Sequence, residues 1–429
     1  MKIKDIKALE ILDSRGNPTV SATVILDNGA TGTAMVPSGA STGSYEAVEL
    51  RDGDKNRYNG LGVLTAVKNI ETKIKPALIG LNPEDQAEID NIMIKLDGTE
   101  NKAKLGANAI LAVSMATARA AANGLHIPLY EYLTKMNPDF NGQYEMPVPM
   151  MNVLNGGKHA NWATDIQEYM ILPIGAKTIA GAVRICAEIY QALKKVLKDR
   201  GYNITVGDEG GFAPAVASNE ETFIILADAV RAAGYTVGED VVFGIDAAAT
   251  EFYKDGAYNL KKENKIMSGS ELIDFYSDLQ TKYPIYSFED VFAEDDWASF
   301  QEFTAANKNL VQVVGDDLYV TNVKRLEKGI ADKSSNSILI KLNQIGTLTE
   351  TVSAILLARQ NKMTSVISHR SGETEDAFIA DLVVALGAGQ IKTGAPARSE
   401  RTAKYNRLLE IEAELGKKAV YARFPFAGK

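Results

Sequence analysis

"SSNSILIKLNQIGTLTE", residues 334–350, is the stretch of sequence that decides the fold. Its apolar run predicts a buried strand that ends at Lys341, and Thr347 with Glu350 has the S/T-x-x-E spacing of a helix start. A buried strand that leads into a helix is one βα unit of a parallel sheet. The unit also raises a question, because lysine is among the residues that are least often buried.

The same unit recurs through the second part of the chain. Further runs of this kind are DIQEYMILP (165–173), VVFGID (241–246), IYSFED (285–290), VQVVGDD (311–317), TSVISH (364–369) and QIKTG (390–394), each followed by a helical stretch. Repeated βα units predict a parallel sheet, and about eight strands that close on themselves predict a barrel. Residues 136–151 are rich in Pro, Gly and Asn and predict a linker. We therefore expect a C-terminal TIM-like α/β barrel over 143–429.

The chain before the linker has a different pattern. Residues 1–36 alternate with the period of two that is typical of strands, with turn residues at 27–29, and from 60 to 123 the pattern becomes helical. These features predict a smaller α+β domain over 1–135 with an antiparallel sheet. The loop 37–45 consists of small residues and hydroxyls but lacks the GK[ST] ending of a P-loop. We expect it to be a mobile lid that can offer a hydroxyl to a metal.

The overall composition excludes several classes of protein. The 429 residues carry a formal net charge of −9, so no basic field attracts nucleic acid, and we expect no direct nucleic-acid binding. The N-terminal residues lack a signal-peptide pattern, and no apolar stretch approaches the roughly 18 to 20 residues of a membrane helix. We therefore expect a cytoplasmic protein without membrane insertion. Cys186 is the only cysteine, and its place on a helical apolar stripe predicts a core position.

Charged residues stand where the predicted strands end, and this is the main functional signal. They are Asp246, Glu289, Asp316, Lys341, His369 and Lys392, and from Glu289 onward they follow at intervals of about one βα unit. In a closed barrel the carboxyl ends of the strands meet at one mouth, where active sites of this architecture lie. A single charged strand end is usually a solvated loop residue or a helix cap. Six in succession favour a site.

Three of these side chains predict a metal site. The carboxylates of Asp246, Glu289 and Asp316 would repel one another at neighbouring strand ends unless a cation lay among them, and all-oxygen ligands suit magnesium. A lysine beside such a site can act as a base if burial and positive neighbours lower its pKa, which is our expectation for Lys341. It would then remove a proton next to a carboxylate, and metal ions would offset the charge of the resulting aci-enolate.

The sequence resembles the enolase family along nearly its whole length. The motifs that carry the resemblance are LDSRGNPTV (12–20), VPSGASTGSYEAVELRDGD (36–54), LNGGKHA (154–160), DIQEYMILP (165–173), VGDEGGFAP (206–214), FAEDDW (292–297), VGDDLYVTN (314–322), ILIKLNQIGTLTET (338–351), VISHRSGETED (366–376) and QIKTGAPARSER (390–401). The resemblance implies a lyase of glycolysis and gluconeogenesis that reversibly dehydrates 2-phosphoglycerate to phosphoenolpyruvate. It also implies an irregular barrel start, ββαα and then βα units.

The resemblance implies a role for each matching residue. Lys341 matches the base that takes the C2 proton, and Glu209 matches the acid that protonates the departing 3-hydroxyl, with Glu168 beside it. Two Mg²⁺ ions per active site are implied. Asp246, Glu289 and Asp316 match the ligands of the first ion, and Ser41 matches a ligand of the second, which arrives with substrate. Lys392, Arg370 and Ser371 match residues that hold carboxylate and phosphate, and His159, Gln167 and His369 match other pocket contacts.

The resemblance also implies a homo-oligomer, a dimer or higher. Where family members form intersubunit ion pairs, this sequence has Ser21, Glu410 and, in place of a partner for Arg15, Ala413. We therefore expect the usual interface ion pairs to be absent.

Other functions stay open on the sequence. A barrel aldolase would use Lys341 as a Schiff-base amine, although it would not need the carboxylate trio. An acid-sugar dehydratase would share the barrel and the metal site. A non-catalytic scaffold or surface-binding role would keep the fold alone.

Overall fold

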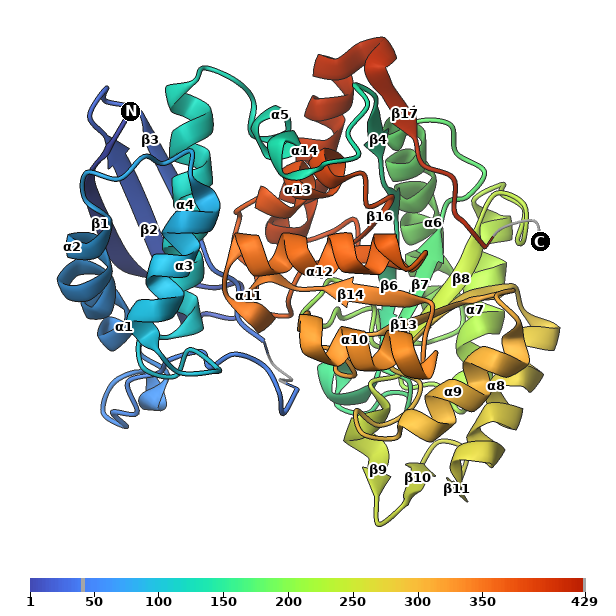
Figure 1. Cartoon of the computed structure of the whole chain (residues 1–429). Coiled ribbons are helices and arrows are strands. Elements are labelled where there is room, and N and C mark those ends of the chain that lie inside the picture. The colour runs from blue at the N-terminus through green and yellow to red at the C-terminus, as the bar shows by residue number, and fades with distance from the viewer. Residues whose placement is uncertain (40–42, 427–429) are drawn as a thin grey trace.

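The computed structural model describes residues 1–39 and 43–426, without the side chain of His159. Figure 1 shows an N-terminal part, coloured blue to cyan, beside a larger barrel. The expected lid loop at 37–45 is therefore described only in part. No helix in these ranges is long and apolar enough to cross a membrane.

An antiparallel sheet and a group of helices form the N-terminal part, which confirms the α+β class. β1 (Ile3–Leu12), β2 (Pro18–Leu26) and β3 (Thr31–Met35) pair in that order, and α4 (Ala107–Gly124) packs against β2 and β3. Gly32 permits this close packing, because a β-carbon there would lie 2.1 Å from the backbone nitrogen of Ala120. The other elements are η1 (Tyr58–Gly60), α1 (Leu64–Asn69), the π-helix η2 (Ile70–Ile74), α2 (Lys75–Leu78), α3 (Gln86–Asp97), α5 (Leu129–Leu133) and η3 (Thr134–Met136).

The second part is a closed barrel, as the sequence predicts. Its strands are β5 (Val148–Pro149), β6 (Met151–Asn155), β7 (Glu168–Leu172), β8 (Val242–Asp246), β12 (Ile285–Glu289), β13 (Gln312–Gly315), β14 (Ser337–Ile340), β15 (Thr364–Ser368) and β16 (Gln390–Lys392). They pair in the order β5-β16-β15-β14-β13-β12-β8-β7-β6. Only Met150 separates β5 from β6, so the two ends of the sheet meet in one interrupted strand. β7 is antiparallel to both neighbours, and the other pairs are parallel.

Helices cover the outside of the barrel, and two of them follow β7 before β8, which confirms the ββαα start. The helices are α6 (Ile179–Asp199), α7 (Asn219–Ala232), α8 (Gly269–Lys282), α9 (Trp297–Asn307), α10 (Val323–Asp332), α11 (Leu342–Ile345), α12 (Leu348–Gln360), α13 (Phe378–Leu386) and α14 (Ser399–Leu415), with η4 (Gly157–Ala160), η5 (Ala249–Phe252) and η6 (Gly416–Lys418). The hydroxyl of Thr347 accepts from the backbone N–H of Glu350, so the predicted helix start is confirmed. Cys186 in α6 is fully buried, as expected.

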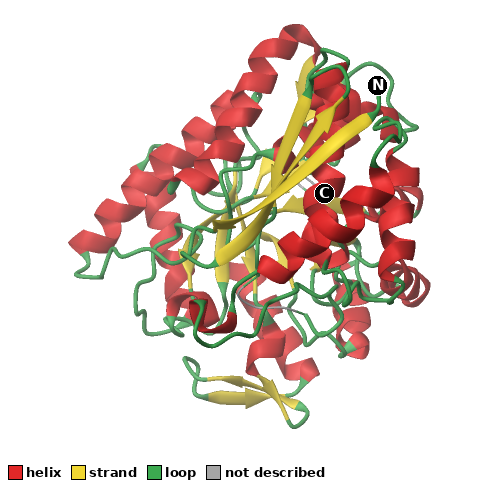
Figure 2. Cartoon of the chain, turned by 90° about the vertical axis from the view of Figure 1, so that its left-hand side faces the viewer, coloured by secondary structure: helices red, strands yellow, loops and turns green. Residues whose placement is uncertain are grey.

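Two small sheets lie outside the barrel wall. β9 (Tyr253–Lys254), β10 (Ala257–Leu260) and β11 (Lys265–Met267) form a three-stranded sheet that projects from the body, at the bottom of Figure 2. β4 (Tyr144–Met146) pairs in parallel with β17 (Ala419–Tyr421), which brings the C-terminal tail back to the start of the barrel domain.

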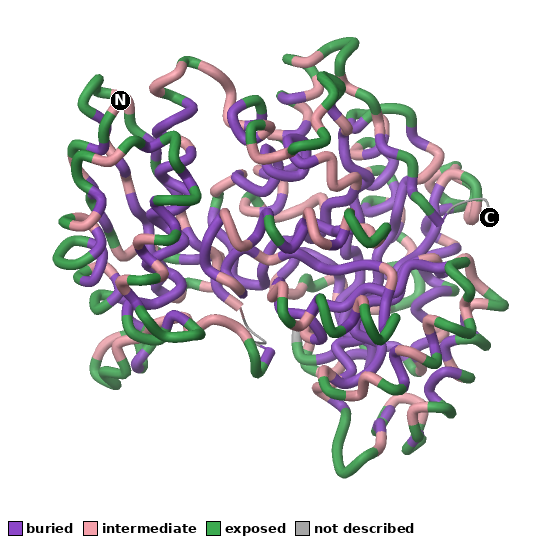
Figure 3. Tube along the Cα trace, viewed as in Figure 1, coloured by how far each residue is buried: buried purple, intermediate pink, exposed green. Residues whose placement is uncertain are grey.

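The barrel strands are buried along most of their length, as the purple trace in Figure 3 shows. We use the term interior cluster for Val148, Met150, Met170, Leu172, Val242, Val314, Leu339, Val366, Ala422, Phe424 and Phe426, which pack together. Phe424 and Phe426 come from the tail after β17, with ring centroids 5.8 Å apart. Side chains alternate between the two faces of a strand, so residues two or four positions beyond members of this cluster point into the same interior.

Candidate active site

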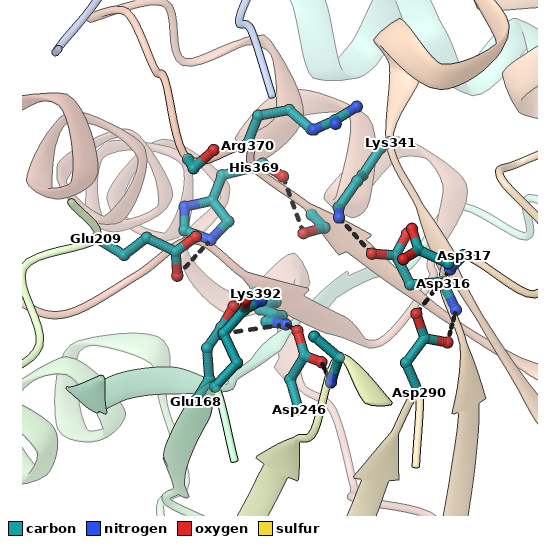
Figure 4. A pocket seen from close by; sticks show the side chains of 14 residues that line it. Glu168, Glu209, Asp246, Asp290, Asp316, Asp317, Lys341, His369, Arg370 and Lys392 are labelled. Atoms are coloured by element: carbon teal, nitrogen blue, oxygen red, sulfur yellow. Dashed lines mark hydrogen bonds and ion pairs between the residues drawn. The ribbon is translucent and has the colours of Figure 1, made fainter. Parts of the chain in front are cut away.

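One pocket at the carboxyl ends of the parallel strands collects the charged residues that the sequence singled out. Its lining residues are Gln167, Glu168, Glu209, Asp246, Ala248, Asp290, Asp316, Asp317, Lys341, Ser368, His369, Arg370, Ser371 and Lys392. Figure 4 shows Lys392 beside Glu168 and Asp246, and Lys341 pointing toward Asp316. Within the described residues the lining holds six acidic side chains and three basic ones, Lys341, Arg370 and Lys392. The pocket is therefore a buried site with an excess of carboxylates.

Strand periodicity explains why these charges point inward. Asp246 lies four residues after Val242, and Lys341 lies two residues after Leu339, so each shares a strand face with a member of the interior cluster. The register adds proximity across strands, because Asp246 is the direct partner of Glu289 on one side and of Glu168 on the other. Convergence of the strand-end charges, expected from the sequence, is thus present in the structure.

Lys392 is the centre of one charge cluster. Its ammonium lies 2.8 Å from Glu289 Oε1, 3.0 Å from Asp246 Oδ2 and 3.2 Å from Glu168 Oε2. Burial works to lower the pKa of Lys392, but these carboxylates outweigh it and raise the pKa well above the ordinary value. Burial, with Glu209 as neighbour, raises the pKa of Glu168, and burial, with Asp246 as neighbour, raises the pKa of Glu289. The single positive charge of Lys392 therefore does not neutralise the three carboxylates around it.

Lys341 is the centre of a second cluster, and its expected low pKa is wrong for this structure. Burial, Arg370 and Lys392 do work to lower the pKa of Lys341. However, the ammonium is bonded to Asp316 Oδ2, and this contact raises the pKa above the ordinary lysine value. Burial works in turn to raise the pKa of Asp316, but Lys341 holds it below the usual range. The structure thus shows a closed ion pair with Asp316, and this contact outweighs the burial and the positive neighbours on which the expected low pKa rested.

Three neighbouring aspartates form a compact oxygen site. Asp290, Asp316 and Asp317 each offer one carboxylate oxygen within 4.8 Å of the others. Asp290 also accepts from the backbone N–H groups of Asp316 and Asp317, at 2.8 Å each, so it orders the turn after β13. Burial and the neighbouring Asp317 raise the pKa of Asp290 well above its ordinary value. This set shares only Asp316 with the trio Asp246, Glu289 and Asp316, whose role as metal ligands stays a prediction.

The donor set fits a hard divalent cation. All candidate ligands among the described residues are carboxylate oxygens, which suit Mg²⁺. Oε2 of Glu289 and Oε1 of Gln167 are buried and have no hydrogen-bond partner among the described residues. Buried polar atoms normally have a partner. These two atoms therefore indicate that the pocket is built to hold a further positively charged or polar group.

Glu209 lies on the opposite side of the pocket from the aspartates, in the loop that follows α6. Nε2 of His369 lies 3.5 Å from Glu209 Oε2, and the amide of Asn152 donates to the same oxygen at 2.9 Å. Burial lowers the pKa of His369 to about 4, so the ring is neutral at neutral pH. The pocket thus sets a carboxyl group, Glu209, across from an amine, Lys341, as Figure 4 shows.

Arg370 connects the pocket to the N-terminal part of the chain. Its guanidinium donates to both carboxylate oxygens of Glu46, at 2.8 and 3.1 Å. The side chain of Gln344 donates to Asp316 Oδ1 at 2.8 Å and reaches Glu46 Oε1 at 3.4 Å. The N-terminal loop therefore contacts a lining residue of the site through a buried bidentate pair.

Not all sequence-predicted residues can be placed. Ser41 lies outside the described residues, and the side chain of His159 is likewise not described, although its backbone belongs to η4. Glu289 touches the site through Lys392 and does not line the pocket itself.

Sequence reasoning missed several residues at the site. Asp290 and Asp317 each follow a predicted ligand directly, so the doublets in "SFED" and "GDD" were the available signal. Asn152, Gln344 and Glu46 gave no comparable signal. Their contacts depend on how separate loops meet.

Two of the residues concerned in the expected loss of interface ion pairs, Glu410 and Arg15, have partners within the chain. Ser21 is buried in β2, and Glu410 accepts from Arg407 at 3.1 Å within α14. The guanidinium of Arg15 donates to the hydroxyl of Ser38 at 3.2 Å.

Two family models match the chain. One is described as enolase, N-terminal domain, and matches residues 3–133; the other is described as enolase, C-terminal TIM barrel domain, and matches residues 143–427. The second match alone covers more than half of the chain, and its description agrees with the closed barrel seen in the structure.

Proposed function

The chain belongs to the enolase family, and from this premise we propose that it is a glycolytic and gluconeogenic enolase. The reaction would be the reversible, Mg²⁺-dependent dehydration of 2-phospho-D-glycerate to phosphoenolpyruvate. The observation that supports it most is the opposition of Lys341 and Glu209 across one buried pocket rich in carboxylates. This geometry suits removal of a proton from one face of a small acid and delivery of a proton to the other.

Lys341 is the proposed base that takes the C2 proton. It can act only as a free amine, so its ion pair with Asp316 has to open first. Once Asp316 is engaged elsewhere, burial, Arg370 and Lys392 all work to lower the pKa of Lys341. In the structure this ion pair is closed, and Asp316 raises the pKa of Lys341, so the lysine is protonated.

Glu209 is the proposed acid that protonates the departing 3-hydroxyl. The amide of Asn152 and the ring of His369 hold one of its oxygens in place. Burial, with Glu209 as neighbour, raises the pKa of Glu168, which favours its protonated form beside Glu209. In the reverse direction Glu209 would take the proton from water.

Binding of the substrate's anionic groups falls to the basic side of the pocket. Arg370, Lys392 and Ser371 are the proposed contacts for carboxylate and phosphate, with His159, Gln167 and His369 as further contacts. Asp246, Glu289 and Asp316 would hold the first Mg²⁺, and Ser41 would contribute to the second, which arrives with substrate. When bound, Mg²⁺ would offset the charge that builds on the substrate's carboxylate oxygens.

The proposal is tested by turnover of 2-phosphoglycerate, followed as rising ultraviolet absorbance in the presence of Mg²⁺. Lys341→Ala should abolish exchange of the C2 proton with deuterated water, whereas Glu209→Gln should retain some exchange and lose dehydration. Lys324→Ala, an exposed lysine on α10, is the control. Absence of turnover by folded, metal-loaded protein, or equal loss of both reactions in the two variants, would contradict the proposal. Borohydride trapping of substrate on Lys341 would indicate an aldolase instead.

The identity of the metal ligands needs a separate experiment. We expect Asp246→Asn and Glu289→Gln to weaken Mg²⁺ binding measured by calorimetry without substrate. Asp290→Asn and Asp317→Asn are the comparison variants. If these two weaken binding while the first two do not, the compact aspartate set is the metal site and the predicted trio is wrong.

The proposal includes a homodimer or higher oligomer that forms without the usual interface ion pairs. Glu410 is engaged by Arg407 of its own helix, and Ser21 carries no charge. Sedimentation velocity at micromolar concentration should show a species larger than the 46.4 kDa monomer. A monomer alone would contradict this part of the proposal.

A further inference from the structure

Arg401 is a buried cation next to the pocket that the proposed mechanism does not use. It lies near the start of α14 and is fully buried. Among the described residues, the carboxylate that pairs with it is that of Glu400, 3.6 Å from Nε. Gly394 makes room for the side chain, because a β-carbon there would lie 2.9 Å from Cδ of Arg401. Burial of a guanidinium is costly unless its N–H groups are hydrogen-bonded.

The guanidinium forms its hydrogen bonds with residues of two active-site loops. Nη1 lies 2.6 Å from Nδ1 of His369 and donates to the carbonyl of Arg370 at 2.6 Å. Nη2 donates to the carbonyl of Ser371 at 2.7 Å and to that of Asp208 at 3.0 Å. Asp208 directly precedes Glu209. One side chain therefore joins the loop after β15 to the loop that carries Glu209.

The contact with His369 fixes where the ring holds its proton. A guanidinium has N–H donors and no acceptor, and it stays charged at accessible pH. Nδ1 of His369 must therefore accept, which leaves the proton of the neutral ring on Nε2. Nε2 is the atom that faces Glu209 Oε2, at 3.5 Å. The ring can then donate toward Glu209 or toward a substrate oxygen between them.

We propose that Arg401 is a positioning residue. It holds His369 as the Nε2–H tautomer and ties together the two loops that carry Glu209 and Arg370. The geometry stands by itself, whereas the effect on catalysis rests on the proposed function. Three charged groups act on the ring: Glu209 from its loop, Arg401 from α14 and Glu373 from the segment after β15. Of these, only Arg401 works to keep the ring unprotonated.

The test measures the tautomer of His369 directly by NMR of the ring nitrogens. The chain has only three histidines, so protein labelled with ¹⁵N-histidine gives three rings, and His369→Asn identifies the signal of interest. In the wild type, Nδ1 of His369 should be unprotonated and Nε2 protonated from pH 8 down to about 5. Arg401→Met should give mixed tautomers and a protonation midpoint that moves from about 4 toward 6.5. A merely structural contact would leave both readouts unchanged.

Turnover supplies the second readout. Arg401→Met should lower kcat by about 10- to 100-fold, the typical effect of losing a group that orients a site residue, and change KM by less than about threefold. Arg401→Lys keeps the charge but offers one nitrogen, so its kcat and tautomer ratio should lie between those of the wild type and Arg401→Met. Arg407→Met, on the same helix but bonded to Asp381 at 2.9 Å, is the matched control and should keep the wild-type tautomer.

Wild-type tautomer, midpoint and kcat in Arg401→Met would overturn the proposal. If that variant does not fold, the same three wild-type values in Arg401→Lys would overturn it. If the wild-type protein fails to dehydrate 2-phosphoglycerate, the proposed function is wrong. The tautomer spectra would still decide the role of Arg401, so the two failures are distinguishable.

Discussion

Val242 and Asp246 lie on the same strand and point into the same barrel, yet their surroundings differ completely. Val242 belongs to the interior cluster, where strand residues pack with Phe424 and Phe426 of the C-terminal tail. Asp246, four residues further on and on the same face of the strand, faces the buried ammonium of Lys392. The same contrast holds between Leu339 and Lys341. Two regions with opposite chemistry therefore share one set of strands.

The difference shows how the fold separates stability from chemistry. Apolar burial stabilises by about 25 cal/mol per Å² without any partner geometry, so the interior cluster can support the strands alone. The pocket instead holds carboxylates whose pKa values are raised by burial, such as Glu168 and Asp290, and these cost folding free energy. Variants in the two regions should therefore change different observables.

Lys392→Met should have the largest effect on turnover, and the change lies in the pocket. Removing the cation that touches three carboxylates, and that is proposed to hold substrate, should lower kcat by about 100- to 1000-fold. Lys392→Arg, which keeps the charge but changes its shape, is the control and should recover part of the activity. Unchanged turnover of 2-phosphoglycerate in Lys392→Met would show that the charge is not used.

Phe424→Ala should lower the stability that the interior cluster provides and leave catalysis unchanged. Removing a ring that is 2% exposed should lower the free energy of unfolding by about 3–5 kcal/mol, measured by urea denaturation. The kcat of the folded fraction should stay within about twofold of the wild type. Ile266→Ala, at a side chain that is 73% exposed on β11, is the control and should cost less than about 0.5 kcal/mol. A large loss of kcat in Phe424→Ala would mean that the two regions are coupled.

Acid should lower the free energy of unfolding through protonation of His369. Its folded pKa, about 4, lies below its ordinary value of 6.5, so the unfolded chain binds more protons between these values. The free energy of unfolding should therefore fall as pH drops from about 6.5 to about 4, by on the order of 3 kcal/mol from this group. Urea titrations across this range should show a shallower slope for His369→Asn. An identical slope in the variant would place the acid sensitivity in other groups.

Gln312→Met should have the smallest effect of the four and tests the polar side chains inside the barrel. Its amide donates to the Gln390 side chain at 2.8 Å and to the hydroxyls of Ser337 and Thr364 at 3.0 and 2.9 Å. Leaving these groups unpaired should cost about 1–3 kcal/mol in urea denaturation. A double variant with Gln390→Met should recover part of the loss, since both partners then become apolar. Strict additivity would show that the two amides act independently.

The sequence predicted much of the fold, for a physical reason that is local. Runs such as VVFGID and SILIK need only their own apolar residues and flanking turns to become strands, and capping residues such as Thr347 start helices through bonds three residues away. The family resemblance added the ββαα start of the barrel. Strand boundaries differ from the predicted ones by up to three residues, as at the start of β7, because strand ends depend on pairing.

The sequence predicted those site residues whose position along a strand determines which way their side chains point. Asp246, Lys341 and Lys392 belong to this group, since alternation along a buried strand points them into the barrel. The contribution of Glu46 could not be foreseen, because it depends on contact between the two parts of the chain.

What the sequence determined by itself is the barrel, its inward charges and their residue types, because periodicity and composition act over a few residues. The tertiary structure decided which charges meet. It paired Lys341 with Asp316, which raises rather than lowers the pKa of the lysine, and it set Arg401 against Nδ1 of His369. Coulomb energies and hydrogen bonds depend on distances of a few ångströms between residues far apart in sequence, and only the folded chain sets those distances.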